Sequence, residues 1–407
     1  MQDTPKGSRL HIAIFGRRNA GKSSLINALT NQDIALVSDI PGTTTDPVYK
    51  AMEILPLGPV MMIDTAGIDD VGELGVLRIE RTMQVLNKAD LAVIVVDPDA
   101  GITEFELSLK DSIVKRNIPA VAVVNKIDRY QPEAGKISQW ETQLELKLHP
   151  VSAYSKAGIE ELKKLLIEKA PDDWEGTPVI GDLITGGDTI VLVVPIDTAA
   201  PKGRLILPQV QTIRDILDHD ASCIVVKERE LKDALSNLRH SPRMVVTDSQ
   251  EFLKVAADTP DNILLTSFSI LMARHKGDLE TLVAGAKAID KLQPGDKVLI
   301  AEGCTHHRQA DDIGKVKIPR WLRQAVGGEL HFDWVSGSHF PVDISQYSLI
   351  VHCGSCMLNR REMLYRLAAA REKGVPIVNY GVLIAKIHGI LYRALGPFPL
   401  AQMILDE

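Results

Sequence analysis

The chain carries Gly16-Arg17-Arg18-Asn19-Ala20-Gly21-Lys22-Ser23, a match to the phosphate-binding pattern G-x-x-x-x-G-K-S. An apolar run, His11–Phe15, precedes the motif, and a helical pattern, Ser24–Leu29, follows it. In this strand–loop–helix context backbone N–H groups wrap the β-phosphate of a nucleotide, the lysine neutralises the β/γ oxygens, and the serine hydroxyl ligates magnesium. The motif therefore predicts a P-loop nucleotide-binding domain.

Three further motifs follow apolar runs in the order expected of a GTP site. Asp64-Thr65-Ala66-Gly67 ends the run Val60–Ile63, so Asp64 can hold magnesium through water and Gly67 can approach the γ-phosphate. In Asn125-Lys126-Ile127-Asp128, the carboxylate of Asp128 can accept hydrogen bonds from guanine N1 and N2, which adenine cannot supply. Ser152-Ala153 places backbone near guanine O6. The predicted nucleotide-binding residues are Gly16, Asn19, Ala20, Gly21, Lys22, Ser23, Ser24, Asp64, Gly67, Asn125, Lys126, Asp128, Ser152 and Ala153, with Lys22, Thr44 and Gly67 as the catalytic set.

Apolar runs alternate with amphipathic helical stretches along the whole chain, which is typical of α/β units with parallel sheets. The polar Pro/Gly stretch Pro171–Pro178 separates the first series of such runs from a second. A third series begins after a helical stretch at Leu279–Leu292. We predict an α/β protein of three parallel-sheet domains, at 1–172, 178–270 and 271–407, of which the first has a Ras-like P-loop GTPase fold.

The composition and net charge of the chain limit the classes of partner that it can have. The 407 residues are 45% hydrophobic and 24% charged, as in ordinary globular proteins, and the net charge of −7 argues against a broad nucleic-acid-binding face. The N-terminus has no apolar core of a signal peptide, and Lys386, His388 and Arg393 interrupt the most apolar late stretch. We therefore expect a cytoplasmic protein with neither nucleic acid nor membrane as a partner.

Three of the four cysteines lie in Cys304-Thr305-His306 and His352-Cys353-Gly354-Ser355-Cys356. The first half-motif follows the strand-like run Lys297–Ala301, and the second follows Ser348–His352, so both can reach the crevice at the carboxyl ends of parallel strands. Three thiolates suit an iron–sulfur cluster, and three thiolates with one histidine suit structural zinc. A helix N-terminus after Cys356 is expected to lower its thiol pKa. Cys223 lies within an apolar strand and is interpreted as a core residue.

The first part of the chain resembles the translation-factor-like, potassium-activated GTPases, the group that contains Era, Der and MnmE. The resemblance rests on Pro41-Gly42-Thr43-Thr44-Thr45-Asp46, which looks like their switch loop, and on Asn19. It implies that Thr44 is a second magnesium ligand and that Asn19 helps to hold potassium. Ile68 follows the Asp-Thr-Ala-Gly motif where Ras-like enzymes have a water-orienting glutamine, so hydrolysis should be slow without a cation or a partner.

The cysteine pattern behind such a GTPase domain resembles the HydF family of FeFe-hydrogenase maturation GTPases, over essentially the whole chain. The resemblance implies a 4Fe-4S cluster on Cys304, Cys353 and Cys356, with His306 and His352 as fourth ligand or as hydrogen-bonding neighbours. It also implies that 178–270 is a dimerisation domain and 271–407 an iron–sulfur cluster-binding domain, and that the protein is a homodimer with a scaffold or carrier role. Such a carrier accepts a diiron precursor bearing CO, cyanide and a bridging dithiolate from the radical-SAM maturases HydE and HydG, and passes it to the FeFe-hydrogenase apoprotein.

Two alternatives belong to other functional classes. One is an RNA-modification or ribosome-assembly GTPase whose C-terminal cysteines form a zinc-binding module, which the acidic net charge and the absence of aromatic-rich RNA motifs disfavour. The other is an iron–sulfur redox enzyme regulated by its GTPase domain, for which the sequence offers no flavin or nicotinamide fingerprint.

Overall fold

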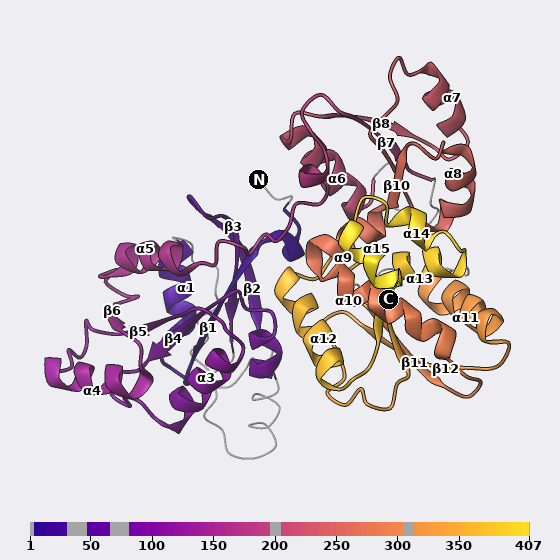
Figure 1. Ribbon diagram of the computed structural model, residues 1–407. Helices are drawn as coiled ribbons and strands as arrows, with labels where there is room; N and C mark the ends of the chain where they lie inside the picture. The colour runs from indigo at the N-terminus through magenta and orange to yellow at the C-terminus, as the bar shows by residue number, and fades with distance from the viewer. Residues whose placement is uncertain (1–3, 31–46, 66–80, 196–204, 304–311, 407) are drawn as a thin grey trace. The chain divides into compact units, whose positions relative to one another are not determined.

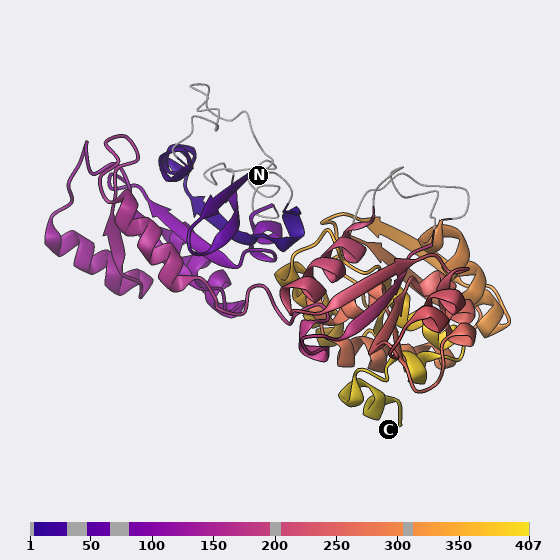
Figure 2. The same ribbon diagram turned by 90° about the horizontal axis from the view of Figure 1, so that it is seen from above.

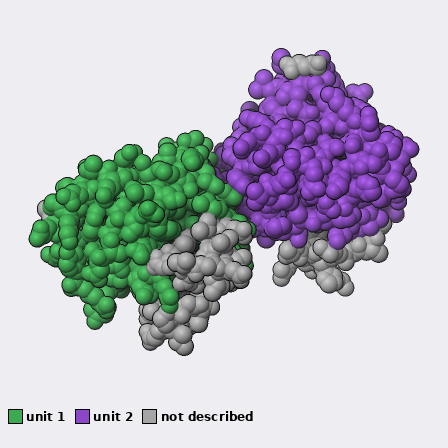
Figure 3. Space-filling model, turned by 90° about the horizontal axis from the view of Figure 1, so that it is seen from below, with its two compact units in different colours: residues 1–175 green, residues 176–407 purple. Residues whose placement is uncertain are grey.

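The computed structural model describes residues 4–30, 47–65, 81–195, 205–303 and 312–406. These residues form two compact units, Met1–Glu175 and Gly176–Glu407 (Figure 3), and the division falls within the predicted linker Pro171–Pro178. Within the described ranges, no helix combines the length and the apolarity needed to cross a membrane.

The first unit contains a sheet in the order β2-β3-β1-β4-β5-β6. Its parallel strands are the predicted apolar runs: β1 (Leu10–Gly16), β3 (Gly58–Asp64), β4 (Leu91–Val96), β5 (Ala120–Val124) and β6 (Leu148–Pro150). Side chains of α1 (Lys22–Thr30) and α5 (Ile159–Lys169) share one hydrophobic core with the sheet, while α3 (Glu104–Lys115) and α4 (Ala134–Leu144) share another. The parallel strands are thus covered on both faces, which explains their continuous apolar sequences.

One strand of this sheet was not predicted. β2 (Val48–Ile54) pairs antiparallel with β3 at the edge of the sheet. Its residues alternate imperfectly between buried and exposed, so the segment lacks the apolar run that marks the inner strands.

The second unit contains two four-stranded parallel sheets (Figures 1 and 2). The first has the order β10-β9-β7-β8, from β7 (Thr189–Val193), β8 (Ser222–Val226), β9 (Met244–Thr247) and β10 (Leu264–Ser267). It is accompanied by α6 (Leu207–Asp218), α7 (Leu231–Asn237), α8 (Phe252–Asp258) and α9 (Phe268–Lys276). Cys223 lies in β8, partly buried and packed against the core, as the sequence indicated.

The second of these sheets has the order β12-β11-β13-β14. Its strands are β11 (Lys297–Glu302), β12 (His331–Ser336), β13 (Leu349–His352) and β14 (Ile377–Asn379), and its helices are α10 (Leu279–Ala286), α11 (Ile318–Val326), α12 (Arg360–Glu372), α13 (Tyr380–Ile387), α14 (Leu391–Ala394) and α15 (Pro399–Asp406). One hydrophobic core includes side chains of both sheets, and α9 continues across residue 270, where the sequence predicted a domain boundary. The two sheets therefore belong to one compact unit, and a division into domains at 270 stays a prediction.

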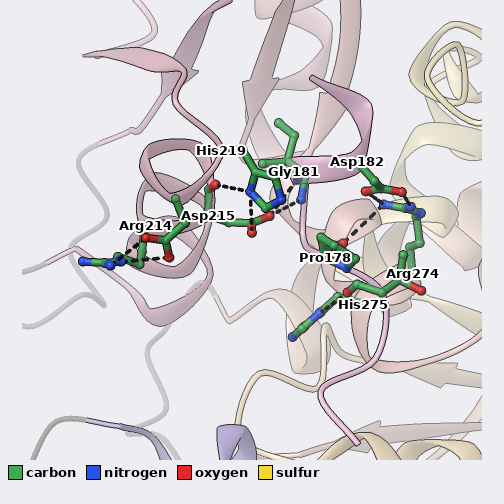
Figure 4. A network of polar contacts seen from close by, with 11 residues as sticks. Pro178, Gly181, Asp182, Arg214, Asp215, His219, Arg274 and His275 are labelled. Atoms are coloured by element: carbon green, nitrogen blue, oxygen red, sulfur yellow. Dashed lines mark hydrogen bonds and ion pairs between the residues drawn. The ribbon is translucent and has the colours of Figure 1, made fainter. Parts of the chain in front are cut away.

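Polar contacts hold the first segment of the second unit, residues 177–182, against the rest of that unit (Figure 4). The backbone N–H groups of Ile180 and Gly181 donate to one oxygen of Asp215, at 2.7 and 2.8 Å. Arg274 in α9 pairs with Asp182, and the neighbouring His275 donates from Nδ1 to the Thr177 carbonyl at 2.7 Å. The first residues after the linker are thereby held against α6 and α9.

Candidate nucleotide and cysteine sites

The phosphate loop joins the end of β1 to the start of α1. Lys22 is buried, and its ammonium donates to the carbonyls of Gly16 and Arg17 at 2.9 and 2.8 Å. Gly21 has a φ of 86°, and a Cβ there would lie 2.3 Å from Asn125 Nδ2. Only glycine satisfies both the left-handed backbone and this close approach, so the loop geometry requires the motif's second glycine.

The two residues predicted to bind magnesium, Ser23 and Asp64, form a hydrogen-bonded pair next to the loop. Ser23 Oγ donates to Asp64 Oδ2 at 2.5 Å, while Asp64 Oδ1 is buried and has no hydrogen-bond partner among the described residues. Burial raises the pKa of Asp64, and the Ser23 hydrogen bond and the charges of Lys22 and Lys50 oppose that rise. A buried carboxylate oxygen without a donor, beside a hydroxyl, fits a hard cation that prefers oxygen ligands.

The part of the site predicted to hold guanine is built around Asn125. This side chain is buried; it donates from Nδ2 to the Ala20 carbonyl at 2.9 Å and accepts from the Ala153 N–H at 3.1 Å. It thereby ties the phosphate loop to the Ser152–Ala153 segment. Asp128 is exposed at the rim and accepts from Ser152 Oγ at 2.5 Å, which orients its carboxylate.

The structure thus brings Gly16, Ala20, Gly21, Lys22, Ser23, Asp64, Asn125, Asp128, Ser152 and Ala153 to the carboxyl end of one sheet. Asn19 is exposed in the loop with a φ of 61°, and Lys126 is turned away to pair with Asp97 at 2.7 Å. Thr44 and Gly67 lie outside the described residues, and so do Cys304 and His306.

In the second unit, β11 and β13 are neighbouring parallel strands, so Gly303 and Cys353 follow them at the same edge of the sheet. Ala301 pairs with His352, and the Cys353 N–H donates to the Ala301 carbonyl at 3.0 Å. The Cys353 sulfur accepts the N–H of Gly303 at 3.0 Å and that of Ser355 at 3.4 Å. Backbone donors aimed at a sulfur stabilise a thiolate, so this turn fits a metal-bound cysteine. Cys304 lies outside the described residues, and within those residues no group of three or more His, Cys, Asp or Glu side chains is placed to hold a metal ion.

The expectation of a lowered pKa at Cys356 is wrong for the metal-free site. Burial, with the Cys353 charge next, raises the pKa of Cys356 to about 11. Helix α12 begins only at Arg360, and its first turn is capped by the side chain of Asn359, which accepts from the Glu362 N–H. Cys356 therefore lies too far before the helix to profit from its dipole, which acts within the first turn.

His352 has both ring nitrogens engaged inside the protein. It is fully buried, Nε2 lies 3.0 Å from Arg366 Nη1, and Nδ1 lies 3.0 Å from the Cys353 carbonyl. Because an arginine can only donate, Nε2 must accept and Nδ1 must carry the proton. Burial, helped by the Arg366 charge, lowers the pKa of His352 to about 3. Of the two roles predicted for this histidine, the geometry favours a hydrogen-bonding neighbour over a ligand.

Several polar groups beside the cysteines were not predicted from the sequence. Glu302, at the end of β11, accepts from Tyr380 Oη at 3.1 Å, and Arg366 and Glu362 form a buried ion pair at 2.9 Å in α12. The spacing of Glu362 and Arg366 by four residues signals a helical ion pair. It gives no sign that the pair would be buried beneath the cysteine turn.

The first unit is a GTPase domain that binds GTP and magnesium: residues 11–126 match the family model described as a 50S ribosome-binding GTPase. In the second unit, residues 179–277 match the hydrogen maturase F dimerization domain, and residues 280–397 match the hydrogen maturase F tetramerization domain. These two models together cover more than half of the chain. The chain belongs to the hydrogen maturase F (HydF) family of hydrogenase-maturation GTPases.

Curated relatives resemble the chain over a shorter length. The tRNA modification GTPase MnmE of Laribacter hongkongensis (strain HLHK9) is 37% identical over 171 residues, which is 41% of this chain and 36% of that protein. The GTPase Der of Sulfurihydrogenibium sp. (strain YO3AOP1) is 36% identical over 183 residues, 42% of this chain and 40% of that protein. Among solved structures, Era in complex with MgGDPNP and a 16S ribosomal RNA segment matches 54% of this chain and 94% of its own, at 22% identity and a TM-score of 0.37. The chain thus spans well under half the length of the curated relatives.

Proposed function

We propose that this protein is a GTP-hydrolysing scaffold or carrier for maturation of the FeFe-hydrogenase active site. It binds a 4Fe-4S cluster through Cys304, Cys353 and Cys356, accepts a diiron precursor carrying CO, cyanide and a dithiolate from HydE and HydG, and delivers that precursor to the apo-hydrogenase. The observation that carries the proposal is the Cys353 sulfur, which accepts two backbone N–H groups at the end of β13 in a chain of the hydrogen maturase F family.

The chain's own residues have distinct tasks at the cysteine site. The turn after β13 presents Cys353 and Cys356 together, and the end of β11 leads directly to Cys304. When bound, the cluster supplies an iron at which another iron unit can dock. Because His352 is held by Arg366 and the Cys353 carbonyl, it orients the turn and leaves the fourth iron position to another group.

In the nucleotide site, Lys22 neutralises the β/γ-phosphate oxygens, while Ser23, Thr44 and Asp64 hold magnesium and Gly67 approaches the γ-phosphate. Asn19, exposed in the loop, helps to hold a potassium ion that accelerates an otherwise slow reaction. GTP acts by population shift: the GTP-bound form differs from the GDP-bound form in its affinity for a maturase or for the hydrogenase. Hydrolysis then resets the carrier.

Assembly is part of the proposal. The matched models are dimerization and tetramerization domains, and within the described part of the chain β8 is an edge strand of its sheet, with Val225 45% exposed. A free strand edge offers unpaired backbone groups to a second chain. We propose a cytoplasmic homodimer that pairs through this edge.

The test is electron paramagnetic resonance with iron and sulfide analysis on anaerobically reconstituted, reduced protein, beside Cys304→Ala. A 4Fe-4S signal that is lost in the variant supports the proposal. Stoichiometric zinc without iron would overturn it and favour the RNA-directed GTPase with a zinc module. No observation in the structure favours that alternative at present.

A further inference from the structure

Arg366 is buried completely beneath the cysteine turn. Its exposed fraction is 0%, and it is among the largest fully buried side chains of the described chain. The guanidinium donates to Glu362 Oε1 at 2.9 Å, to the Gly337 carbonyl at 2.7 Å and to His352 Nε2 at 3.0 Å. It also lies over the Phe340 ring, 5.2 Å from its centroid.

Burying such a charge is costly. Desolvation of an ion costs several kcal/mol even after relaxation, and a buried ion pair is often replaceable by apolar side chains of similar volume without loss of stability. The Nε atom of Arg366 is also buried without a partner among the described residues. Packing alone does not explain a charged side chain at this position.

The contacts of Arg366 lead directly to the proposed cluster ligands. Its bond to His352 Nε2 fixes the proton on Nδ1, which donates to the Cys353 carbonyl at 3.0 Å and lies 3.1 Å from Ser355 Oγ. Ser355 has a left-handed φ of 57° and points its N–H at the Cys353 sulfur. Arg366 thus holds, through His352, the turn that shapes the sulfur's surroundings.

The positive charge of Arg366 would also affect the reduction of a cluster bound at the cysteine turn. Reduction adds an electron to an iron–sulfur cluster and makes it more negative, and cluster potentials depend on nearby charge, hydrogen bonds to sulfur and solvent exposure. Arg366 bonds His352, next to Cys353, through Nη1, whereas its counterion Glu362 bonds the other terminal nitrogen, Nη2. Arg366, and not Glu362, is therefore the member of the pair that bonds the His352–Cys353 segment.

We propose that Arg366 is a positioning residue that stabilises the reduced 4Fe-4S cluster, by its buried positive charge and by fixing His352 against the Cys353 turn. This inference rests on the proposed function, because it requires the cluster to bind at Cys353 and Cys356. It assigns opposite effects to the two members of the ion pair. Loss of Arg366 should lower the reduction potential, and loss of the Glu362 charge should raise it.

The experiment is a redox titration of the reconstituted full-length protein, followed by the electron paramagnetic resonance of the reduced cluster. At a fixed solution potential, Arg366→Met should shift the ratio of reduced to oxidised cluster at least tenfold toward the oxidised form. For a one-electron couple this corresponds to a reduction potential lowered by about 59 mV. Glu362→Gln should shift the ratio the other way. Arg366→Lys keeps the charge and should lie nearer to wild type than Arg366→Met.

Arg371→Met is the matched control, because Arg371 is an exposed arginine of the same helix that bonds Thr281. It should leave the potential unchanged. Iron content and thermal unfolding of each variant establish that the cluster and the fold are present. If Arg366→Met does not fold or load iron, the inference is tested by the reduction potential of Glu362→Gln, compared with that of the wild-type protein.

Full iron loading with an unchanged potential in Arg366→Met, or in Glu362→Gln, overturns the inference and leaves the proposed function intact. A wild-type protein that binds no 4Fe-4S cluster overturns the proposed function itself. The two failures are therefore distinguishable.

Discussion

Ser23 and Asp64 are joined by a 2.5 Å hydrogen bond from Oγ to Oδ2, while the second oxygen of Asp64 is buried with no described partner. Leaving a buried acceptor unsatisfied costs about 1–3 kcal/mol. That cost would disappear on binding of a cation, which is the basis of the first prediction, a magnesium-binding role for Asp64.

We expect Asp64→Asn to weaken magnesium-dependent GTP binding by roughly ten- to hundredfold, the loss of one hydrogen-bonded charged group. The amide keeps the size of the side chain but removes the negative charge that attracts the cation. A magnesium titration of fluorescent GTP-analogue binding measures the effect. Asp99→Asn, at an exposed carboxylate of the same unit, is the control and should bind as wild type does. Equal magnesium affinity in the two variants would exclude Asp64 as a magnesium-binding residue.

A second prediction concerns base selectivity. Asp128→Asn should lower GTP affinity roughly ten- to hundredfold, because the amide replaces an acceptor of two guanine N–H groups. Xanthosine triphosphate has a carbonyl in place of the guanine amino group and should bind the variant better than it binds wild type. Competition binding with GTP, ATP and xanthosine triphosphate tests this. Unchanged GTP preference would mean that another group reads the base.

Much of the sheet structure and of the nucleotide site was predictable, because each motif in the sequence follows directly on an apolar run that forms a strand. The inner strands are buried on both faces and therefore appear as apolar runs, each followed by its functional residues. The contacts of Arg366 were not predictable, because an arginine in a helical sequence is ordinarily solvated and only the fold places it under Cys353. The lowered pKa expected for Cys356 is wrong for a related reason. The fold buries this thiol in the turn before α12, and burial raises its pKa more than a nearby helix start can lower it.

The third prediction is a pH dependence of stability from His275. Burial is the main cause that lowers its pKa from 6.5 to about 4, and its Nδ1–H donates to the Thr177 carbonyl. Between pH 6.5 and pH 4 the unfolded chain binds a proton at this histidine and the folded chain does not. Stability is therefore lost as the pH falls through this window, by roughly 3 kcal/mol in total.

Chemical denaturation of the full chain at pH 7 and at pH 5, beside His275→Gln, measures this contribution. The glutamine amide can still donate to Thr177 but does not titrate, so the variant should lose less stability on acidification. An identical loss in both proteins would assign the pH dependence to other groups, such as the buried His352.

The last prediction separates the two sites. Lys22→Ala should slow GTP hydrolysis by about 10²–10³-fold, the usual effect of removing one donor to the transition state. The same variant should keep its 4Fe-4S signal and iron content, because each compact unit has its own hydrophobic core and Lys22 belongs to the first unit. Lys164→Ala, at an exposed lysine of α5, is the control and should hydrolyse GTP normally. Loss of the cluster in Lys22→Ala, with the fold intact by circular dichroism, would show that nucleotide binding is needed to build the cysteine site, and a modular carrier would then have to be abandoned.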